Sequence, residues 1–440
     1  MKNIEIAIKK IGINGEGIGY YNNTVVFIQN TFPGDLVEIN NLEKRDGYYL
    51  AKVSKYLKKS NDRQKPQCHI YDKCQVCSLM PLKYESQLQA KVEYLTDSIS
   101  KYAHKKIKVN KVIADDNPFY YRNSIKLPFF NFNDKLAIGI HFRDTNHYVK
   151  LNDCIVQSKI INQITRDVLN ILDKYRYRAY DKQTKQGLRY FLVRAFDDEA
   201  MVTFVTGKNT KIVDEALDEM MEITNLKSIN QTTNTKANNK MIVEPIKNLR
   251  GKKSINVPFN NFTFKLSPES FIQLNSKQAI KMYDVIKEYL GNNNQLVLDL
   301  FCGIGSITCY INECAQRIIG IEINKAAIKD AKENAKKHRL NNLEFVCGDV
   351  DEKIKTYAKN RDVDAIIVDP PRTGLSDFTI ESIIRSKAKK LIYASCNPST
   401  LGKDLKTLLK YYEIKDVTLI DMFPNTMHVE CVVLMSRVQN

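Results

Sequence analysis

The chain has 440 residues, 43% of them hydrophobic, which is enough for about two or three domains and excludes an intrinsically disordered protein. Its formal net charge of +17 favours a polyanionic partner such as nucleic acid. A genome whose composition raises the lysine content of all its proteins would also give a high positive charge. No apolar run reaches the ~18 residues that a membrane span needs, and the start, MKNIEIAIKK, is unlike a signal peptide. We therefore expect a cytoplasmic protein without a membrane anchor. Its ten cysteines should stay reduced, as metal ligands, catalytic groups or core residues.

Residues 1–58 predict a small β-barrel of the OB type. Roughly five short strands fit into this stretch, which is typical of a nucleic-acid-binding platform. Breaks are expected at NGEGIGYY and TFPGD, where Gly and Pro interrupt the apolar pattern. The expected strands include the runs IEIAIKKI, TVVFIQ, DLVEINNLEK and YYLAKVSKYL.

Residues 59–255 predict a central α+β domain. The polar stretch 58–67 predicts a linker, and the apolar spacing of residues 79–105 predicts a helix. Strand-like runs such as KLAIGIHF, RYFLVRAF and AMVTFVTG follow. The polar segment 227–240 is expected to form a long loop or a hairpin.

Three cysteines follow the expected linker in a C-x₅-C-x₂-C pattern: Cys68, Cys74 and Cys77. One more thiolate would complete the four ligands of a 4Fe-4S cluster. A four-cysteine zinc site fits the same spacing and stays open as the alternative. The C-x₃-C-x₂-C pattern of radical S-adenosylmethionine enzymes is absent.

Residues 256–440 predict an α/β domain with a mostly parallel sheet, because apolar strand-like runs alternate with helical stretches. In VLDLFCGIGSITCYI (297–311), Gly303 and Gly305 stand between a strand and a helix, so that the backbone can approach a ligand. Glu322 ends the next strand, where an acidic residue can accept hydrogen bonds from ribose hydroxyls. The pattern indicates a nucleoside-binding crevice.

The acidic residues of this crevice narrow the choice of cofactor. Asp349 follows the third strand and could meet an adenine edge, while Asp299 and Asp369 add further carboxylates. The third glycine of a dinucleotide fingerprint is replaced by Thr308, so no pyrophosphate cradle is expected. S-adenosylmethionine, a nucleoside with a sulfonium charge and no phosphate, fits this description.

Two residues near the carboxyl terminus indicate covalent chemistry. Cys396 ends a predicted strand at a Pro turn, and Glu430 stands in an otherwise apolar terminal strand. A thiol, a carboxylate and a methyl donor together suggest methylation of uracil C5. Cys396 would add to C6 so that C5 becomes nucleophilic, and Glu430 would then remove the C5 proton. The target base would have to leave its stack.

The set of motifs resembles the S-adenosylmethionine-dependent RNA uracil-5 methyltransferases, in particular the iron–sulfur branch that acts on 23S ribosomal RNA. The resemblance covers nearly the whole chain. It rests on SPESFIQLN (267–275), DLFCGIGS (299–306), GIEI (320–323), DPPR (369–372), SCNP (395–398) and HVE (428–430).

The resemblance implies a Rossmann-like methyltransferase domain, an amino-terminal TRAM barrel, Cys396 as nucleophile and Glu430 as base. It implies Cys154 as the fourth ligand of the 4Fe-4S cluster. The cofactor residues that it implies are Gln273, Phe301, Ser306, Glu322, Asp349 and Asp369. The remaining cysteines are expected to pack in the core, namely Cys302, Cys309, Cys314, Cys347 and Cys431.

These features predict an enzyme that methylates uridine in 23S ribosomal RNA, and we expect a monomer. A transfer-RNA uracil-5 methyltransferase is the alternative within the same chemistry, although its specialised branch resembles a chain without the barrel and the four cysteines. Cytosine-5 methyltransferases carry a Pro-Cys or Thr-Cys nucleophile, whereas this chain has Ser-Cys-Asn-Pro. A non-catalytic RNA-binding assembly factor is disfavoured because Cys396 and Glu430 are both present.

Overall fold

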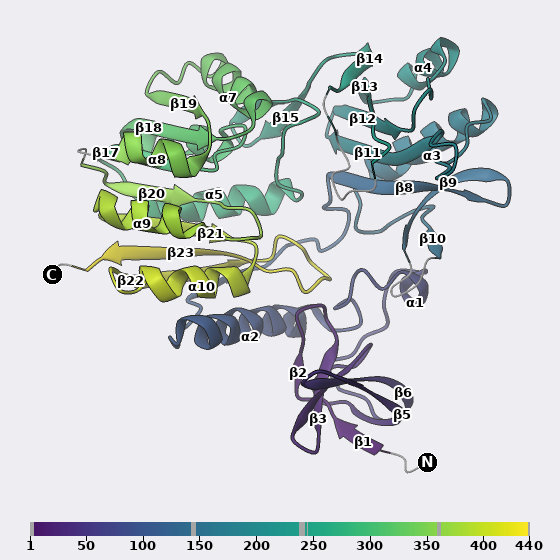
Figure 1. Cartoon of the computed structure of the whole chain (residues 1–440), viewed down its shortest axis with the longest axis horizontal. Coiled ribbons are helices and arrows are strands. Elements are labelled where there is room, and N and C mark those ends of the chain that lie inside the picture. The colour runs from purple at the N-terminus through teal and green to yellow at the C-terminus, as the bar shows by residue number, and fades with distance from the viewer. Residues whose placement is uncertain (1–3, 142–146, 237–242, 244, 359–361, 439–440) are drawn as a thin grey trace. The chain divides into compact units, whose positions relative to one another are not determined.

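The computed structural model describes residues 4–141, 147–236, 243, 245–358 and 362–438. The chain divides into two compact units, each assembled from segments far apart in the sequence (Figure 1). The first unit comprises Met1–Asp115, Pro371–Leu375 and Ala394–Val433. The second unit comprises Asp116–Pro370, Ser376–Tyr393 and Leu434–Asn440.

The first unit begins with a six-stranded barrel-like sheet in the order β1-β5-β6-β4-β3-β2. Alternate residues such as Ile6, Val26 and Val37 point inward and are buried, as the two-residue period of a strand requires. The strands are β1 (Ile4–Ala7), β2 (Lys10–Ile11), β3 (Gly17–Tyr21), β4 (Thr24–Ile28), β5 (Leu36–Arg45) and β6 (Tyr48–Lys58).

The expected break at NGEGIGYY is wrong in its second half, which forms strand β3. A Cβ atom at Gly17 would lie 2.0 Å from the Thr31 hydroxyl, and one at Gly19 would lie 2.2 Å from the Ile6 side chain. The two glycines therefore allow neighbouring chain segments to approach the strand closely, rather than ending it.

The polar stretch 58–67 is not a free linker, because it is held against the barrel. Arg63 donates from Nη2 and Nε to the buried Asp35 carboxylate at 2.6 and 2.9 Å. The Asp35 Oδ1 atom also accepts from the Ser60 amide at 2.8 Å. The Arg63 guanidinium covers the Phe32 and Tyr56 rings at 4.7 and 5.0 Å. Removing one partner of such a desolvated ion pair leaves the other charge buried and unpaired, which strongly destabilises a folded protein.

The rest of the first unit contains the helix expected at 79–105, which spans Tyr84–Ala103 (α2). It packs closely on α10 (Pro398–Leu408) at Gly402, where a Cβ atom would lie 2.9 Å from the Ser98 carbonyl. The short helix α1 (Tyr71–Cys74) precedes α2. Strand β7 (Lys111–Ile113) pairs in parallel with β22 (Tyr412–Ile420).

The second unit begins with a seven-stranded sheet in the order β10-β9-β8-β11-β12-β13-β14. The segment expected as a loop or hairpin at 227–240 starts as strand β13, which pairs antiparallel with β14. The rings of Phe129, Phe191 and Phe204 pack together in its core. The elements are β8 (Ser124–Phe132), β9 (Lys135–His141), β10 (Tyr148–Lys150), α3 (Lys159–Lys174), β11 (Leu188–Phe196), β12 (Glu199–Thr206), α4 (Asp214–Met221), β13 (Leu226–Thr233) and β14 (Lys247–Gly251).

The α/β part forms an eight-stranded sheet in the order β19-β18-β17-β20-β21-β23-β22-β7, in which β19, β18, β17, β20 and β21 are parallel (Figure 1). Every residue of the AIIV strand β20 is buried, as expected for a parallel strand with both faces covered. Further elements are β15 (Ile255–Phe259), β16 (Phe262–Leu266), α5 (Ser276–Leu290), β17 (Asn294–Leu300), α6 (Ser306–Tyr310), a 3₁₀ turn (Asn312–Cys314), β18 (Ala315–Glu322), α7 (Lys325–Lys337), β19 (Leu343–Cys347), α8 (Val350–Ala358), β20 (Ala365–Val368), α9 (Asp377–Ser386), β21 (Lys390–Ser395) and β23 (Glu430–Arg437).

The predicted fold class is therefore confirmed: a Rossmann-like sheet with an amino-terminal β-barrel and a central α+β sheet. Among the described residues, no helix has both the length and the apolar character needed to cross a bilayer.

Candidate active site

The loop between β17 and α6 has the backbone of a ligand-binding turn. Phe301 adopts φ +67°, which is rare for a non-glycine residue and costs free energy. A Cβ atom at Gly303 (φ +54°) would meet nothing within 4 Å, so the loop faces open space there. A Cβ atom at Gly305 would lie 2.7 Å from the Phe345 ring, so glycine is needed for packing at that position.

Glu322, at the end of β18, binds this loop through its carboxylate. Its Oε2 atom accepts from the Gly303 amide at 3.2 Å and its Oε1 atom accepts from the Asn324 amide at 2.8 Å. Asn324 in turn caps α7. The predicted position of Glu322 beside the glycine loop is thus what the structure has.

Asp299 is buried beneath the loop and is incompletely satisfied. Its Oδ2 atom accepts from the Thr308 hydroxyl at 2.5 Å, while its Oδ1 atom has no hydrogen-bond partner among the described residues. Burial raises the pKa of Asp299 to about 7, and the nearby charges of Asp369 and Glu322 add to the rise. Asp299 and Asp369 are two acidic groups with few described hydrogen-bond donors around them, and such a pair suits a cationic ligand. These residues fit the sulfonium of S-adenosylmethionine.

Asp369 and Gln273 lie together, as the resemblance implies. The Gln273 side-chain amide donates to Asp369 Oδ2 at 3.4 Å. Burial raises the pKa of Asp369 to about 7, and the Gln273 hydrogen bond works in the opposite direction. Asn123 donates to the Gln273 carbonyl at 3.0 Å and so supports this segment, a role that the sequence did not predict.

The other two implied cofactor residues occupy different surroundings. Ser306 begins α6, and its buried hydroxyl lies 2.9 Å from the Tyr283 hydroxyl. Asp349 is exposed at the start of α8, where its Oδ1 atom accepts from the Asp351 amide at 2.8 Å. The Gly348 amide donates to the Glu322 carbonyl at 3.0 Å, which joins the ends of β18 and β19.

Cys396 stands between β21 and α10, one residue before the helix cap. The Asn397 side chain accepts from the Ser399 amide at 3.2 Å and donates to the Arg372 carbonyl at 2.9 Å. The DPPR turn and the SCNP turn are therefore bound to each other. The amino terminus of a helix carries partial positive charge, which stabilises a nearby anion such as a thiolate. Cys396 is partly exposed, as a nucleophile must be.

Glu430 is the first residue of β23 and is only 2% exposed. Strands β21 and β23 are neighbours, and two contacts indicate that they run antiparallel. The Arg437 amide donates to the Lys389 carbonyl at 2.9 Å at one end of the pair. The Cys431 thiol donates to the Ser395 carbonyl at 3.7 Å at the other end of the pair. Glu430 therefore lies beside the end of β21, where Cys396 follows Ser395.

The pKa of the buried Cys431 thiol is affected by both predicted catalytic groups. Burial raises the pKa of the Cys431 thiol well above its usual value, and the nearby charges of Glu430 and Cys396 raise it further. Cys396 and Glu430 therefore both lie close to the Cys431 thiol. The arrangement brings Cys396 and Glu430 to adjoining ends of two neighbouring strands, and we call this place the edge.

The segment that precedes Glu430 is held by a buried polar network that sequence reasoning missed. Lys91 of α2 and Asp421 form an ion pair in which both side chains are fully buried. Lys91 also donates to the Phe423 carbonyl at 3.0 Å, and the Tyr84 hydroxyl donates to Asp421 at 2.7 Å. Burial lowers the pKa of Lys91, and Asp421 opposes that shift. The partners are 330 positions apart, so no local pattern could have indicated them.

Within its described residues, the structure does not show a metal site at the predicted ligands. Cys68, Cys74 and Cys77 are partly exposed thiols of the first unit, and Cys154 is a partly exposed thiol of the second. Nowhere in the described ranges does a group of three or more His, Cys, Asp or Glu side chains take an arrangement that could hold a metal ion.

The five remaining cysteines were expected in the core, and four of them are buried. Cys347 is the exception. It is exposed at the end of β19, with its thiol 3.8 Å from the Ile323 carbonyl, so the expectation is wrong at this position. It stands where a parallel strand leaves the sheet, and strand ends are less covered than strand centres.

A family model described as tRNA (Uracil-5-)-methyltransferase matches residues 83–438, and a TRAM domain model matches residues 2–53. The chain belongs to the tRNA (uracil-5-)-methyltransferase family. It is an RNA methyltransferase with an amino-terminal TRAM domain, which confirms the resemblance to the RNA uracil-5 methyltransferases and the predicted class of enzyme. The family also supports S-adenosylmethionine as the cofactor.

Relatives of this family member span its whole length. An uncharacterized RNA methyltransferase of Fusobacterium nucleatum is 34% identical over 99% of this chain and 96% of its own. One of Bacillus cereus is 32% identical over 98% and 96%. The crystal structure of Pyrococcus abyssi tRNA (uracil-54, C5)-methyltransferase in complex with S-adenosyl-L-homocysteine covers 98% of this chain and 100% of that chain, with a TM-score of 0.76 and 24% identity. At this identity the likeness shows the fold.

Proposed function

We propose that the protein methylates C5 of uridine in 23S ribosomal RNA with S-adenosylmethionine, through a covalent bond between Cys396 and uracil C6. The observation that carries this proposal is the pairing of a partly exposed Cys396 with a buried Glu430 at the ends of two neighbouring strands. We expect this RNA-modifying enzyme to act in the cytoplasm and as a monomer.

The chain's own residues would perform three steps. The Cys396 thiolate adds to C6, with the helix terminus of α10 stabilising the anion, and the electron pair moves to make C5 nucleophilic. C5 then takes the methyl group. Glu430 removes the C5 proton, the C5–C6 double bond re-forms, and the Cys396 thiolate leaves. A buried carboxylate is suited to this task, because in a water-excluded site it has few competing proton donors.

The cofactor would be held by the residues that surround the glycine loop. Gly303 leaves room for it, Glu322 can accept from ribose hydroxyls, and Asp299 and Asp369 provide negative charge. Phe301, Ser306, Gln273 and Asp349 complete the set by resemblance. When bound, the cofactor would supply the electrophilic methyl group.

We keep a 4Fe-4S cluster on Cys68, Cys74, Cys77 and Cys154 as a separate proposal, supported by the C-x₅-C-x₂-C spacing and by the resemblance, which implies Cys154 as the fourth ligand. No step of methyl transfer depends on it. Anaerobically purified protein should contain about four iron and four sulfide per chain and absorb visible light broadly, and Cys74→Ser should lose both. Zinc with a colourless protein would identify the zinc alternative, and a metal-free protein would overturn both.

A transfer-RNA substrate is the second candidate, and one observation favours it. The Pyrococcus abyssi enzyme, which is named for tRNA, aligns with 98% of this chain, so most of the amino-terminal barrel is included in the match. The barrel therefore does not by itself distinguish the two RNA classes.

The deciding experiment offers the full chain, labelled S-adenosylmethionine and two substrates, 23S ribosomal RNA and total transfer RNA, both lacking 5-methyluridine. We expect label in 23S RNA, at uridines mapped by mass spectrometry of nuclease fragments. Label confined to transfer RNA would replace the first candidate by the second. Absence of label in both would overturn the proposed function.

A further inference from the structure

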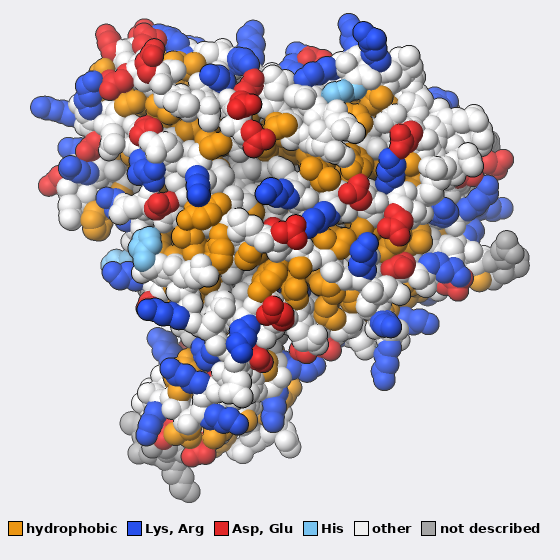
Figure 2. Space-filling model, turned by 180° about the vertical axis from the view of Figure 1, so that it is seen from behind, with side chains coloured by type: hydrophobic (Ala, Val, Ile, Leu, Met, Phe, Trp, Pro, Cys, Tyr) orange, Lys and Arg blue, Asp and Glu red, His pale blue; other side chains and the backbone are white. Residues whose placement is uncertain are grey.

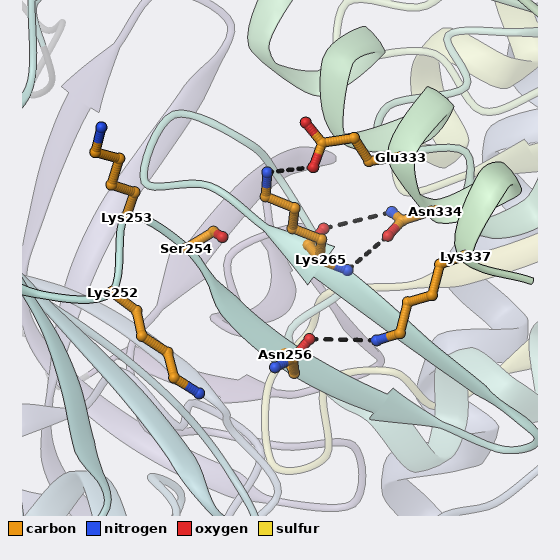
Figure 3. A pocket seen from close by; sticks show the side chains of 8 residues that line it. All are labelled: Lys252, Lys253, Ser254, Asn256, Lys265, Glu333, Asn334 and Lys337. Atoms are coloured by element: carbon orange, nitrogen blue, oxygen red, sulfur yellow. Dashed lines mark hydrogen bonds and ion pairs between the residues drawn. The ribbon is translucent and has the colours of Figure 1, made fainter.

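The second unit contains a hollow of about 540 Å³ whose lining includes four lysines. Lys252 and Lys253 come from the segment between β14 and β15, Lys265 from β16 and Lys337 from α7 (Figure 3). We call it the lysine pocket. It shares no residue with the cofactor or catalytic sites described above.

The charges of the lysine pocket are only partly balanced. Lys252 pairs with Glu199 at 2.5 Å, and Lys265 pairs with Glu333 at 2.5 Å. Lys253 makes no ion pair with any described residue, and Lys337 donates only to the neutral Asn256 side chain at 3.3 Å. Two ammonium groups are therefore left without a carboxylate in the described part of the chain, and the lining as a whole is cationic.

The lining also indicates which part of a polyanion would fit. It holds lysine, serine, asparagine and glutamate side chains and no aromatic ring. Base recognition in single-stranded nucleic acid depends on stacking platforms, which the pocket lacks. Lysine, by contrast, binds phosphate as a point charge with rotatable donors. The pocket is thus suited to a phosphate and unsuited to a nucleobase.

The base of the pocket is held in place by Asn334 of α7. The Asn334 side chain accepts from the Lys265 amide at 2.6 Å and donates to the Ile304 carbonyl of the glycine loop at 3.2 Å. The hairpin that carries Lys265 is therefore fixed to α7 before any ligand binds. Such prior order lowers the entropic cost of binding.

The four lysines of the lysine pocket lie close together around one hollow. On the face drawn in Figure 2, Lys and Arg side chains are scattered among acidic ones and do not form a single stripe. We propose that the lysine pocket binds a backbone phosphate of the RNA substrate, an inference that rests on the proposed function. It would contribute affinity and position without reading sequence.

The test measures binding of the full chain to a 23S ribosomal RNA fragment by fluorescence anisotropy at several KCl concentrations. Lys253→Gln/Lys337→Gln should weaken binding roughly ten-fold near 0.1 M salt and reduce the slope of log K against log salt by about 1. Lys253→Arg/Lys337→Arg should retain most of the affinity. The matched control is Lys332→Gln/Lys336→Gln, which removes the same charge from exposed α7 positions outside the pocket.

Each outcome decides the matter. A pocket variant whose affinity and salt slope equal those of the control variant overturns the inference. Tripolyphosphate serves as the free-anion probe, and if it binds the wild-type pocket while the pocket variant still binds RNA normally, the pocket takes a free anion and the inference also fails. Failure of the wild-type protein to methylate any RNA would overturn the proposed function and leave the binding result readable.

Discussion

The cofactor crevice and the catalytic edge are built in opposite ways. The crevice groups Asp299, Gly303 and Glu322, which come from one continuous strand–helix–strand stretch. The edge groups Cys396 and Glu430, whose support comes from Arg372 and from the Lys91–Asp421 pair. Local chain geometry therefore orders the glycine-loop part of the crevice, to which a contact between distant segments adds Gln273 and Asp369. The edge is ordered by contacts between distant segments.

The comparison teaches that the two sites should fail differently. Changes in the crevice alter the charge of a pocket whose backbone remains in place. Changes beneath the edge release a segment and can affect folding and catalysis together. Four variants, taken from the largest expected effect to the smallest, probe this difference.

Replacing the nucleophile at the edge should have the largest effect. Cys396→Ala should reduce methyl transfer at least about 10⁴-fold, because the covalent step is lost. It should also abolish the covalent complex with RNA containing 5-fluorouridine, measured by denaturing electrophoresis. Cys314→Ala, which changes a buried cysteine that has no proposed catalytic role, is the matched control and should keep both. A crosslink that persists in Cys396→Ala would remove Cys396 from its proposed role.

Replacing the proposed base separates the steps at the same edge. Glu430→Gln should lower turnover by about 10²–10⁴-fold, because proton removal is slowed after the methyl group has been transferred. A denaturation-resistant protein–RNA complex carrying labelled methyl should accumulate. Glu413→Gln, at an exposed position of β22, should behave as wild type. Normal turnover by Glu430→Gln would show that another group takes the proton.

Breaking the buried pair under the edge tests whether distant contacts order it. Lys91→Met leaves Asp421 buried without its cation and should lower the free energy of unfolding by about 3–5 kcal/mol, measured by urea denaturation. Lys91→Met/Asp421→Asn should recover much of this loss because no buried charge is left. If Lys91→Met alone unfolds at the wild-type urea concentration, the pair does not stabilise the edge.

A crevice variant should have the smallest effect, seen as a pH dependence. The raised pKa of Asp299, about 7 against an ordinary 3.8, means that the native state keeps a proton which the unfolded state has lost. Stability without cofactor should therefore fall as pH rises from about 4 to about 7, by an amount of about 1–4 kcal/mol from this group. Asp299→Asn should remove that part of the fall and leave the part due to Asp369. An unchanged profile would mean that Asp299 ionises normally.

Local features of the sequence were sufficient where backbone preference and periodicity decide the structure. The glycine turn, the alternation of apolar strands with helices and the placing of Cys396 at the end of a strand against a Pro turn are all read from neighbouring residues. Errors arose where a residue type had a second use. Gly17 and Gly19 permit close packing within β3 instead of ending a strand, and Arg63 anchors a segment whose polarity predicted a linker.

By itself, then, the sequence determined the α/β class, the barrel and the glycine turn, because these depend on interactions among residues close in the chain. The roles of Cys396 and Glu430 stay predictions. Only the tertiary structure decided that Lys91 would meet Asp421, that Cys431 would lie near Cys396, and that four lysines would line one hollow. Such juxtapositions follow from long-range packing, in which strand order and helix docking bring together positions whose spacing along the chain carries no signal.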